Sequence, residues 1–381
     1  MTNPLSISTL QNISEVEEQE WNKCVSSNHP FIQYGFLKAL EESGSATAET
    51  GWMPYHLVLR DHDTVVGVAP QYIKGHSQGE YVFDHSWAHA YERAGGRYYP
   101  KLQLSIPFSP VTGPRFLAMG GEKENEYKSL LMSGAKQIAT KLGISSVHAT
   151  FVQEHDLPLL EDNGYMIRTG EQFHWVNQDY TDFDDFLSQL SSRKRKAIRK
   201  ERKEANNADL TFEIKQGAEI TEEHWDAFFA FYIDTGNRKW GTPYLTRSFF
   251  SLLGPAMGSD VVLFMVKREG RYIAAALNLK SDECLYGRYW GCIEDHRFLH
   301  FETCYYRAID YAIEHGLKRV EAGAQGPHKL ARGYLPTKTY SAHWMQDPGF
   351  HDAVSDFLKA ETRDMNAEIQ YLSNHSPYKK V

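Results

Sequence analysis

The chain has 381 residues, of which 41% are hydrophobic and 24% charged, and its formal net charge at pH 7 is −8. This length suits two domains of ordinary size. The acidic balance argues against binding nucleic acid through bulk charge, although it leaves room for a local basic site. Residues 1–20 lack the pattern of a signal peptide, no apolar run is long enough to cross a bilayer, and the cysteines lack paired short spacing. We therefore expect a cytoplasmic protein with reduced thiols and no membrane insertion.

Two segments of equal length predict β-hairpins. Residues 57–74 and 263–280 each contain two runs of apolar, β-branched or aromatic residues around a charged turn. The two segments align without gaps, so they are candidates for two copies of one structural unit.

A helix followed by a short strand also occurs twice, and each helix is expected to end at a glycine. The matching positions, at one constant offset, are Ala135, Ala139, Gly143, Ile144, Val147 and Ala149 in the first copy and Ala308, Ala312, Gly316, Leu317, Val320 and Ala322 in the second. The apolar stripe of the second helix has helical spacing and includes Cys304, so we expect this thiol to be buried. Two matches in the same order indicate a duplicated α/β unit.

The duplication predicts an α/β (α+β) protein with an N-terminal domain over residues 1–180 and a C-terminal domain over residues 181–381. The first copy contains an insertion around residues 84–117 that is rich in Tyr, Pro and Gly, and such excursions are usually functional or mobile. A basic linker helix over residues 182–206 is expected between the copies, with eight cations among residues 193–203.

The segment 319–334 combines a predicted strand end with a Gly-rich turn and several ionisable side chains. Strand ends followed by such turns are where α/β domains place ligands. The polar side chains that it presents are Glu321, Gln325, His328, Lys329, Arg332 and Tyr334. They would handle protons and an anionic substrate together, whereas the alternative is a tight turn with solvated charges.

A hairpin, strand, helix and strand, found twice and joined by a basic helix, resemble the tandem GNAT architecture of the FemAB-like family. That family groups proteins of peptidoglycan biosynthesis or recognition with the Fem-type aminoacyltransferases. The segments that carry the resemblance are 79–87 (GEYVFDHSW), 98–103 (YYPKLQ), 107–115 (PFSPVTGPR) and 321–333 (EAGAQGPHKLARG). The resemblance implies two GNAT-like domains, each a mixed, mostly antiparallel sheet flanked by helices. It also implies an acyltransferase that moves an acyl group, here an aminoacyl group, to an amine acceptor such as a peptidoglycan precursor.

The donor implied by the resemblance to the Fem-type enzymes is aminoacyl-tRNA. GNAT enzymes that use acyl-CoA bind its pyrophosphate through an Arg/Gln-x-x-Gly-x-Gly/Ala segment, and residues 290–302 lack that pattern. An acyl-CoA-dependent N-acetyltransferase is therefore the alternative donor class. A non-catalytic binding protein that kept the fold is a further alternative, because a fold does not fix a function.

Acyl transfer needs a group that removes a proton from the amine and a group that stabilises the oxyanion. Glu321 is the candidate general base. Lys329 matches the lysine that the resemblance places near the reacting carbonyl, and His328 is the third candidate catalytic residue. His328 and Arg332 are also expected to hold phosphate or carboxylate, and Gln325 is expected to bind substrate.

Two further groups of residues are candidates for substrate binding. The insertion mixes aromatic surfaces with charges, as pockets do, at Asp84, Trp87, Tyr99, Lys101 and Arg115. The cations of 193–203, among them Arg195 and Arg199, would contact phosphates of tRNA or of a UDP-linked precursor, unless they form a plain solvated face. No metal is expected, because the helical His pairs lack a fourth ligand.

Overall fold

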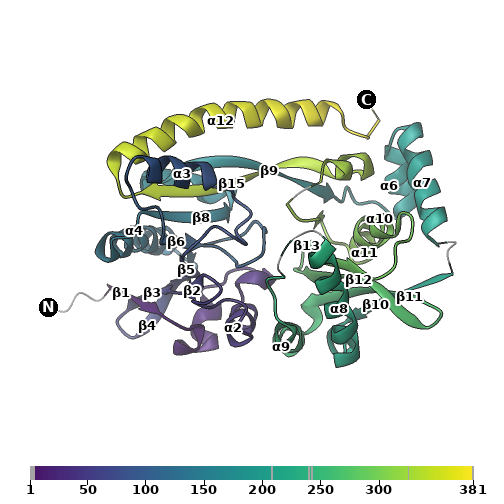
Figure 1. Cartoon of the computed structure of the whole chain (residues 1–381), viewed down its shortest axis with the longest axis horizontal. Helices are drawn as coiled ribbons and strands as arrows, with labels where there is room; N and C mark the ends of the chain where they lie inside the picture. The colour runs from purple at the N-terminus through teal and green to yellow at the C-terminus, as the bar shows by residue number, and fades with distance from the viewer. Residues whose placement is uncertain (1–4, 207–208, 239–240, 242, 325, 380–381) are drawn as a thin grey trace. The chain divides into compact units, whose positions relative to one another are not determined.

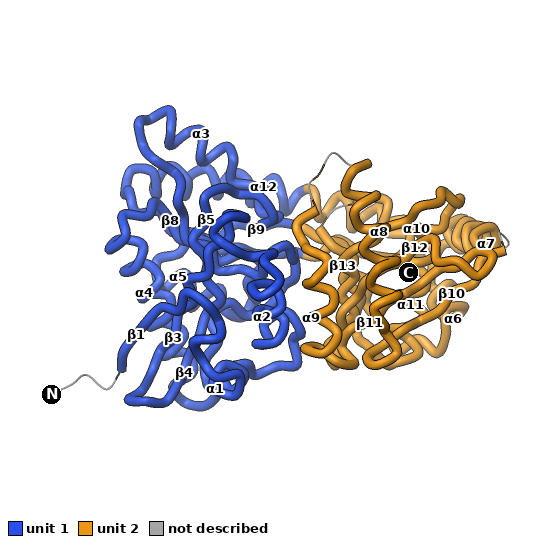
Figure 2. The backbone as a smooth tube through the Cα atoms, turned by 60° about the horizontal axis from the view of Figure 1, so that its bottom comes forward, with its two compact units in different colours: residues 1–170, 338–367 blue, residues 171–337, 368–381 orange. Residues whose placement is uncertain are grey.

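The structure is a computed structural model that describes residues 5–379 apart from 207–208, 239–240, 242 and 325. The chain forms two compact units (Figure 2): unit 1 comprises residues 1–170 and 338–367, and unit 2 comprises residues 171–337 and 368–381. The chain leaves unit 1 within β9 (Met166–Val176) and returns within β15 (Leu335–Met345). Residues 338–367 therefore join unit 1, whereas the sequence led us to expect everything after residue 180 in the second domain.

Unit 1 has a four-stranded sheet in the order β1-β3-β4-β7 and a second run of strands in the order β15-β8-β6-β5-β2 (Figure 1). The strands not yet located are β1 (Leu5–Leu10), β2 (Trp52–Pro54), β3 (His56–Asp61), β4 (Thr64–Ala69), β5 (Gln71–Lys74), β6 (Lys101–Leu104), β7 (Leu117–Ala118) and β8 (Ser146–Val152). The helices are α1 (Glu18–Lys23), α2 (Tyr34–Glu42), α3 (His85–Arg93), α4 (Glu124–Leu142), α5 (Leu157–Asp162) and most of α12 (Pro348–Asn374). The apolar face of α4 builds the main core of the unit against β3, β6 and β8.

Unit 2 has its strands in the order β10-β11-β12-β13-β14-β9. Their bounds are β10 (Leu210–Gln216), β11 (Val261–Arg268), β12 (Arg271–Lys280), β13 (Cys284–Cys292) and β14 (Arg319–Glu321). The helices are α6 (Phe183–Gln189), α7 (Ser192–Asn206), α8 (Glu222–Arg238), α9 (Arg247–Met257), α10 (Leu299–Phe301) and α11 (Arg307–Glu314). The main core packs α6, α7 and α11 against one face of the sheet.

The predicted duplication is confirmed by the strand pairing. Both hairpins form, as β3–β4 and β11–β12, and both helices end before a glycine with a positive φ, Gly143 at 65° and Gly316 at 66°. In each copy a parallel pair follows, with Leu102 opposite Val147 in β6–β8 and Leu285 opposite Val320 in β13–β14. Antiparallel pairs surround these two parallel pairs, as in a mixed sheet.

Three local expectations need correction. The insertion predicted at 84–117 contains β6, which is the counterpart of β13 and thus part of the repeat. The linker expected as one helix over 182–206 is two helices, α6 and α7, that break at Leu190. The second helix contains a π-helical turn at Glu302–Tyr306, and this wider turn moves Cys304 out of the buried stripe to a half-buried position.

Candidate functional site

The parallel pairing of β13 and β14 ends early and leaves a cavity between the two strands. Only Cys284–Tyr286 pair with Arg319–Glu321, after which β14 stops and β13 continues to Cys292. The cavity has a volume of about 110 Å³ and is lined by Ala276, Leu277, Asn278, Gly287, Arg288, Tyr289, Trp290, His300, Cys304, Tyr305 and Ala322. A concave site with apolar walls and a few polar groups, at the carboxyl end of a strand, is typical of a ligand-binding site.

Glu321 lies at the end of β14 and is 3% exposed. Its Oε1 accepts a hydrogen bond from Nε of Arg319 at 3.0 Å, while its Oε2 has no hydrogen-bond partner among the described residues. Leaving a buried carboxylate oxygen without a partner costs free energy, so such atoms are uncommon unless a function requires them. Glu321 therefore keeps one buried oxygen available for a proton.

Lys329 comes from the 3-10 helix Pro327–Arg332 that follows β14, and it is 2% exposed. Its ammonium donates to the carbonyl oxygen of Gly323 at 2.9 Å, just beyond the strand end. Burial lowers the pKa of Lys329 to about 8, Cys304 opposes this shift, and Arg288 adds to it. Lys329 is not itself a lining residue, but its electrostatic neighbours Arg288 and Cys304 both line the cavity.

His174 of β9 is a functional candidate that the sequence did not reveal. It lies opposite Glu321 in the antiparallel β14–β9 pair, and its Nε2 lies 3.0 Å from Oε1 of Gln172. Burial lowers the pKa of His174; Glu321 opposes the shift, while Lys329 acts in the same direction as burial. Glu321 and Lys329 are thus both electrostatic neighbours of one imidazole. Because β9 is remote in sequence, no local pattern pointed to His174.

His328 and Arg332 contact side chains of unit 2 other than Glu321 and Lys329. Nε2 of His328 lies 2.9 Å from the hydroxyl of Tyr305, and burial lowers the pKa of this histidine. The guanidinium of Arg332 lies 3.4 Å from the ring centroid of Phe301 and forms an ion pair with Glu201 of α7 at 3.0 Å. Arg332 therefore meets a carboxylate of the chain itself where a phosphate contact was expected, and Gln325 lies outside the described residues.

Helix α7 is amphipathic, with Ile198 and Ala205 buried. Arg199 is exposed and pairs with Asp184, while Arg195 is half-buried and donates to the carbonyl of Ser188 at 3.4 Å. The exposed basic residues of the helix are Arg193, Lys196, Arg199, Lys200 and Lys203. These residues give unit 2 a basic outer face.

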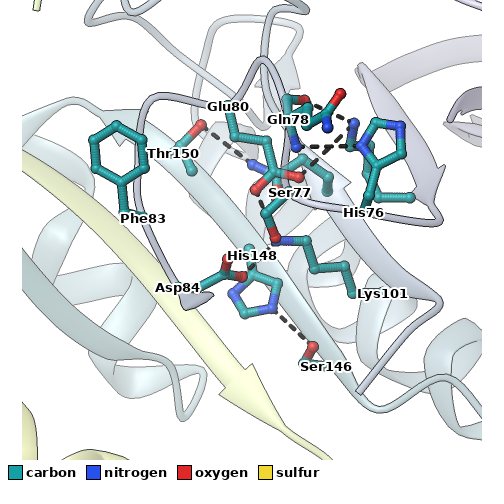
Figure 3. Close-up of polar contacts among 12 residues, drawn as sticks. His76, Ser77, Gln78, Glu80, Phe83, Asp84, Lys101, Ser146, His148 and Thr150 are labelled. Atoms are coloured by element: carbon teal, nitrogen blue, oxygen red, sulfur yellow. Dashed lines mark hydrogen bonds and ion pairs between the residues drawn. The ribbon is translucent and has the colours of Figure 1, made fainter. Parts of the chain in front are cut away.

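In unit 1, most of the expected acceptor residues meet in a buried polar cluster around Lys101, which Figure 3 shows. The ammonium of Lys101 donates to Ser77, Glu80 and Asp84 at 2.8, 2.7 and 2.5 Å. Tyr99 joins through Ser77 at 2.7 Å. Burial raises the pKa of Glu80 to about 7. Burial also acts to raise the pKa of Asp84, but Lys101 outweighs it and holds the pKa of Asp84 far below the usual range.

A pair of histidines extends this cluster. Nδ1 of His148 lies 2.7 Å from Nδ1 of His343, and Nε2 of His148 lies 2.7 Å from the hydroxyl of Ser146. The ring of Trp87 meets His343 edge-on at 4.9 Å. Oδ1 of Asp84 and Nε1 of Trp87 have no hydrogen-bond partner among the described residues. Both atoms would suit a bound polar group.

Arg115 has a structural environment instead. It is buried and donates to the backbone carbonyls of Thr150, Val111 and Pro114. Thr150 occupies the position of Gly323 in the alignment of the two copies, so a buried cation donates to the backbone carbonyl at this position in each copy. The cation is a permanently charged guanidinium in unit 1 and a titratable amine in unit 2.

Neither unit shows a metal site: no three His, Cys, Asp or Glu side chains gather as metal ligands in the part of the chain that the structure describes. Within the same residues, no helix is both long and apolar enough to cross a membrane.

Comparisons with known proteins found a matching family and similar solved structures. Residues 12–380 match the model of the FemAB-like family, described as peptidoglycan biosynthesis/recognition. Among solved structures, one titled FemX is 15% identical with a TM-score of 0.55, covering 89% of this chain and 98% of its own. L-PGS from Bacillus licheniformis is 11% identical with a TM-score of 0.53, covering 87% and 98%. A protein of unknown function from Bacteroides thetaiotaomicron VPI-5482 is 12% identical with a TM-score of 0.53, covering 89% and 99%.

No curated protein has significant sequence similarity to the chain. The family match and these whole-length structural likenesses confirm the expected α/β fold class with two tandem GNAT-like domains.

Proposed function

Since a match over nearly the whole chain shows that the protein belongs to the FemAB-like family, we propose that it is an N-acyltransferase whose reacting groups lie in unit 2. It would transfer an aminoacyl group from aminoacyl-tRNA to the amine of a peptidoglycan precursor. The observation that carries this proposal is the buried Lys329, whose pKa is lowered, whose amine donates to Gly323 just beyond β14, and whose electrostatic neighbours Arg288 and Cys304 line the cavity.

In this proposal the acceptor nitrogen attacks the carbonyl carbon of the aminoacyl ester. Negative charge then develops on the carbonyl oxygen, and the ammonium of Lys329 stabilises it. A cation is more effective there than in water because the amine is 2% exposed and the surroundings are poorly polarisable. With a pKa of about 8, Lys329 is mostly protonated at neutral pH, as this role requires.

Glu321 is the proposed general base. The nitrogen must lose a proton as the new C–N bond forms, and the buried Oε2 of Glu321 is available to accept it. The C–O bond of the ester then breaks, and the same proton passes to the departing ribose oxygen. Arg319 would hold the carboxylate in place through its 3.0 Å hydrogen bond to Oε1.

The substrates would be held by two further features. The exposed cations of α7 would contact phosphates of the tRNA, since Lys and Arg bind such groups without regard to base sequence. Within unit 1, Asp84 and Trp87 would bind a polar group of a substrate, because each has a buried polar atom without a partner among the described residues. Arg115 has no part in this proposal, since backbone carbonyls already surround its guanidinium.

The test is transfer of a labelled amino acid from charged tRNA to a UDP-linked peptidoglycan precursor by the purified protein. We expect transfer by the wild type and a loss of about 10²–10³-fold in kcat for Lys329→Met, the usual effect of removing one oxyanion-stabilising group. Calorimetry with acetyl-CoA provides the opposing outcome: clear micromolar binding would contradict an aminoacyl-tRNA donor and favour the acyl-CoA alternative.

A further inference from the structure

Helix α7 does more than present a basic outer face, because two consecutive residues on its inner side reach the turns that carry the cavity and Lys329. Glu201 and Arg202 are both partly buried and both form charged contacts inside unit 2. Neither residue stood out in the sequence, where they are part of a run of mostly basic residues.

Glu201 contacts the segment of Lys329. Its two carboxylate oxygens accept hydrogen bonds from the Arg332 guanidinium at 3.1 and 3.0 Å, and Oε2 also accepts from the hydroxyl of Tyr306. Arg332 in turn donates to the carbonyl of His328 at 2.8 Å. Arg332 therefore stabilises the 3-10 helix Pro327–Arg332 through its hydrogen bond to His328, and Glu201 fixes the position of the Arg332 guanidinium.

Arg202 contacts the π-helical turn that carries Cys304. Its guanidinium donates to both oxygens of Glu302, each at 3.1 Å, and to Asp310 of α11 at 3.1 and 2.6 Å. Glu302 is fully buried, so this bidentate pair fixes the first residue of the π-helical turn. A π-helical turn is a local departure from the α-helix that needs such support and often lies at functional sites.

We infer that Glu201 and Arg202 are positioning residues for the proposed reaction: they hold the helix of Lys329 and the turn of Cys304 in the geometry that the cavity requires. The inference rests on the proposed function, because it assigns these residues to the same site. They act through other residues and do not themselves meet the reacting atoms. A displacement of about 1 Å at such a site can lower a rate by about 10²-fold.

The charged and titratable groups around Lys329 come from several elements. Arg288 lies on β13, Cys304 on the π-helical turn and His174 on β9, while His328 and Arg332 belong to the same helix as the lysine. Loss of Glu201 would leave the Arg332 guanidinium without its carboxylate partner. The 3-10 helix would then lose the contact that connects it to α7.

The first experiment is amide hydrogen exchange of Glu201→Gln, which needs no substrate. We expect faster exchange in residues 328–332 than in the wild type. Glu204→Gln is the matched control, since Glu204 also lies on α7 but pairs with the exposed Arg297, away from the site. Unchanged exchange in residues 328–332 of Glu201→Gln would overturn the inference whether or not the protein transfers acyl groups.

The second experiment is a double-mutant cycle in the transfer assay. We expect Glu201→Gln to lower kcat by about 10-fold or more with little change in the KM for the acceptor, and to have no further effect in a Lys329→Met background. Tyr306→Phe, which removes an uncharged contact to Glu201, should change kcat in the same direction and keeps the test available if Glu201→Gln folds poorly. Additive losses would overturn the inference. Faster exchange without any transfer by the wild type would instead contradict the proposed function, and only the structural link between Glu201 and the helix of Lys329 would remain.

Discussion

At the scale of single residues, the two copies of the repeat differ in the cation that donates to the equivalent backbone carbonyls of Thr150 and Gly323. Arg115 of unit 1 donates to backbone carbonyls, including that of Thr150, while the amine of Lys329 of unit 2 donates to the carbonyl of Gly323. A guanidinium keeps its charge throughout the accessible pH range, whereas a buried amine can lose its proton. This difference is one reason why we propose that the chemistry takes place in unit 2.

The pH dependence of transfer follows from this lysine. Because burial lowers its pKa to about 8, Lys329 loses its proton as pH rises through that value, and the oxyanion loses its counter-charge. We therefore expect kcat to fall above about pH 8. Lys329→Arg should retain measurable transfer and lose this alkaline limb, which pH–rate profiles of the two proteins would show. An unchanged alkaline limb in Lys329→Arg would rule out Lys329 as its origin.

At the scale of elements, the sequence predicted what depends on local patterns. Side-chain periodicity predicts the two hairpins, and the positive φ that a helix end requires predicts a glycine after each helix. The structure has the hairpins and the glycines. The position of Glu321 at a strand end was predicted for the same reason. The π-helical turn was missed, because its residues keep a helical apolar pattern and its support comes from Arg202 of a distant helix.

Contacts between remote segments account for the other omissions. His174 faces Glu321 only because β9 pairs with β14, and His343 joins the cluster of unit 1 only because β15 pairs with β8. No pattern within either strand indicates its partner. Buried polar clusters are assembled in this way, so the sequence predicted Asp84 and Lys101 as site residues without revealing that Lys101 is already surrounded by acceptors.

The segment between β5 and α3, residues 75–84, is held by Lys101 and contributes a pH-dependent term to stability. Because burial raises the pKa of Glu80 from 4.5 to about 7, the folded state keeps a proton that the unfolded state releases between these values. The free energy of unfolding should therefore fall by about 3 kcal/mol as pH rises from 4.5 to 7. Burial lowers the pKa of Lys74 from 10.5 to about 7, so the free energy of unfolding should rise again between pH 7 and 10.5.

Urea denaturation at several pH values would measure both slopes. Glu80→Gln should remove the decrease between pH 4.5 and 7, whereas Glu92→Gln, on the exposed side of α3, should leave it unchanged. Identical pH profiles for the wild type and Glu80→Gln would show that this carboxyl group does not titrate as its burial implies.

At the scale of the whole molecule, the net charge of −8 and the basic outer face of α7 act in opposite directions on a polyanion. Long-range repulsion from an acidic protein is screened by salt, while direct contacts with phosphates release counterions and weaken as salt rises. Binding through α7 would therefore be strongest at low ionic strength, despite the overall charge. This expectation separates a phosphate-binding face from a plain solvated one.

Lys196 and Lys200 provide the test, since they are exposed and lie one turn apart on α7. If both contact phosphates of a tRNA, replacing them with Gln should weaken binding and reduce the slope of log K against log salt by about 0.7–0.9 for each lost contact. Fluorescence anisotropy of labelled tRNA at several salt concentrations measures both quantities. Lys359→Gln, an equally neutralising change at an exposed site on α12, is the control and should leave the slope unchanged. Equal slopes for the wild type and the α7 variant would remove this helix from the tRNA-binding surface, while the role of Glu201 and Arg202 on its inner side would be unaffected.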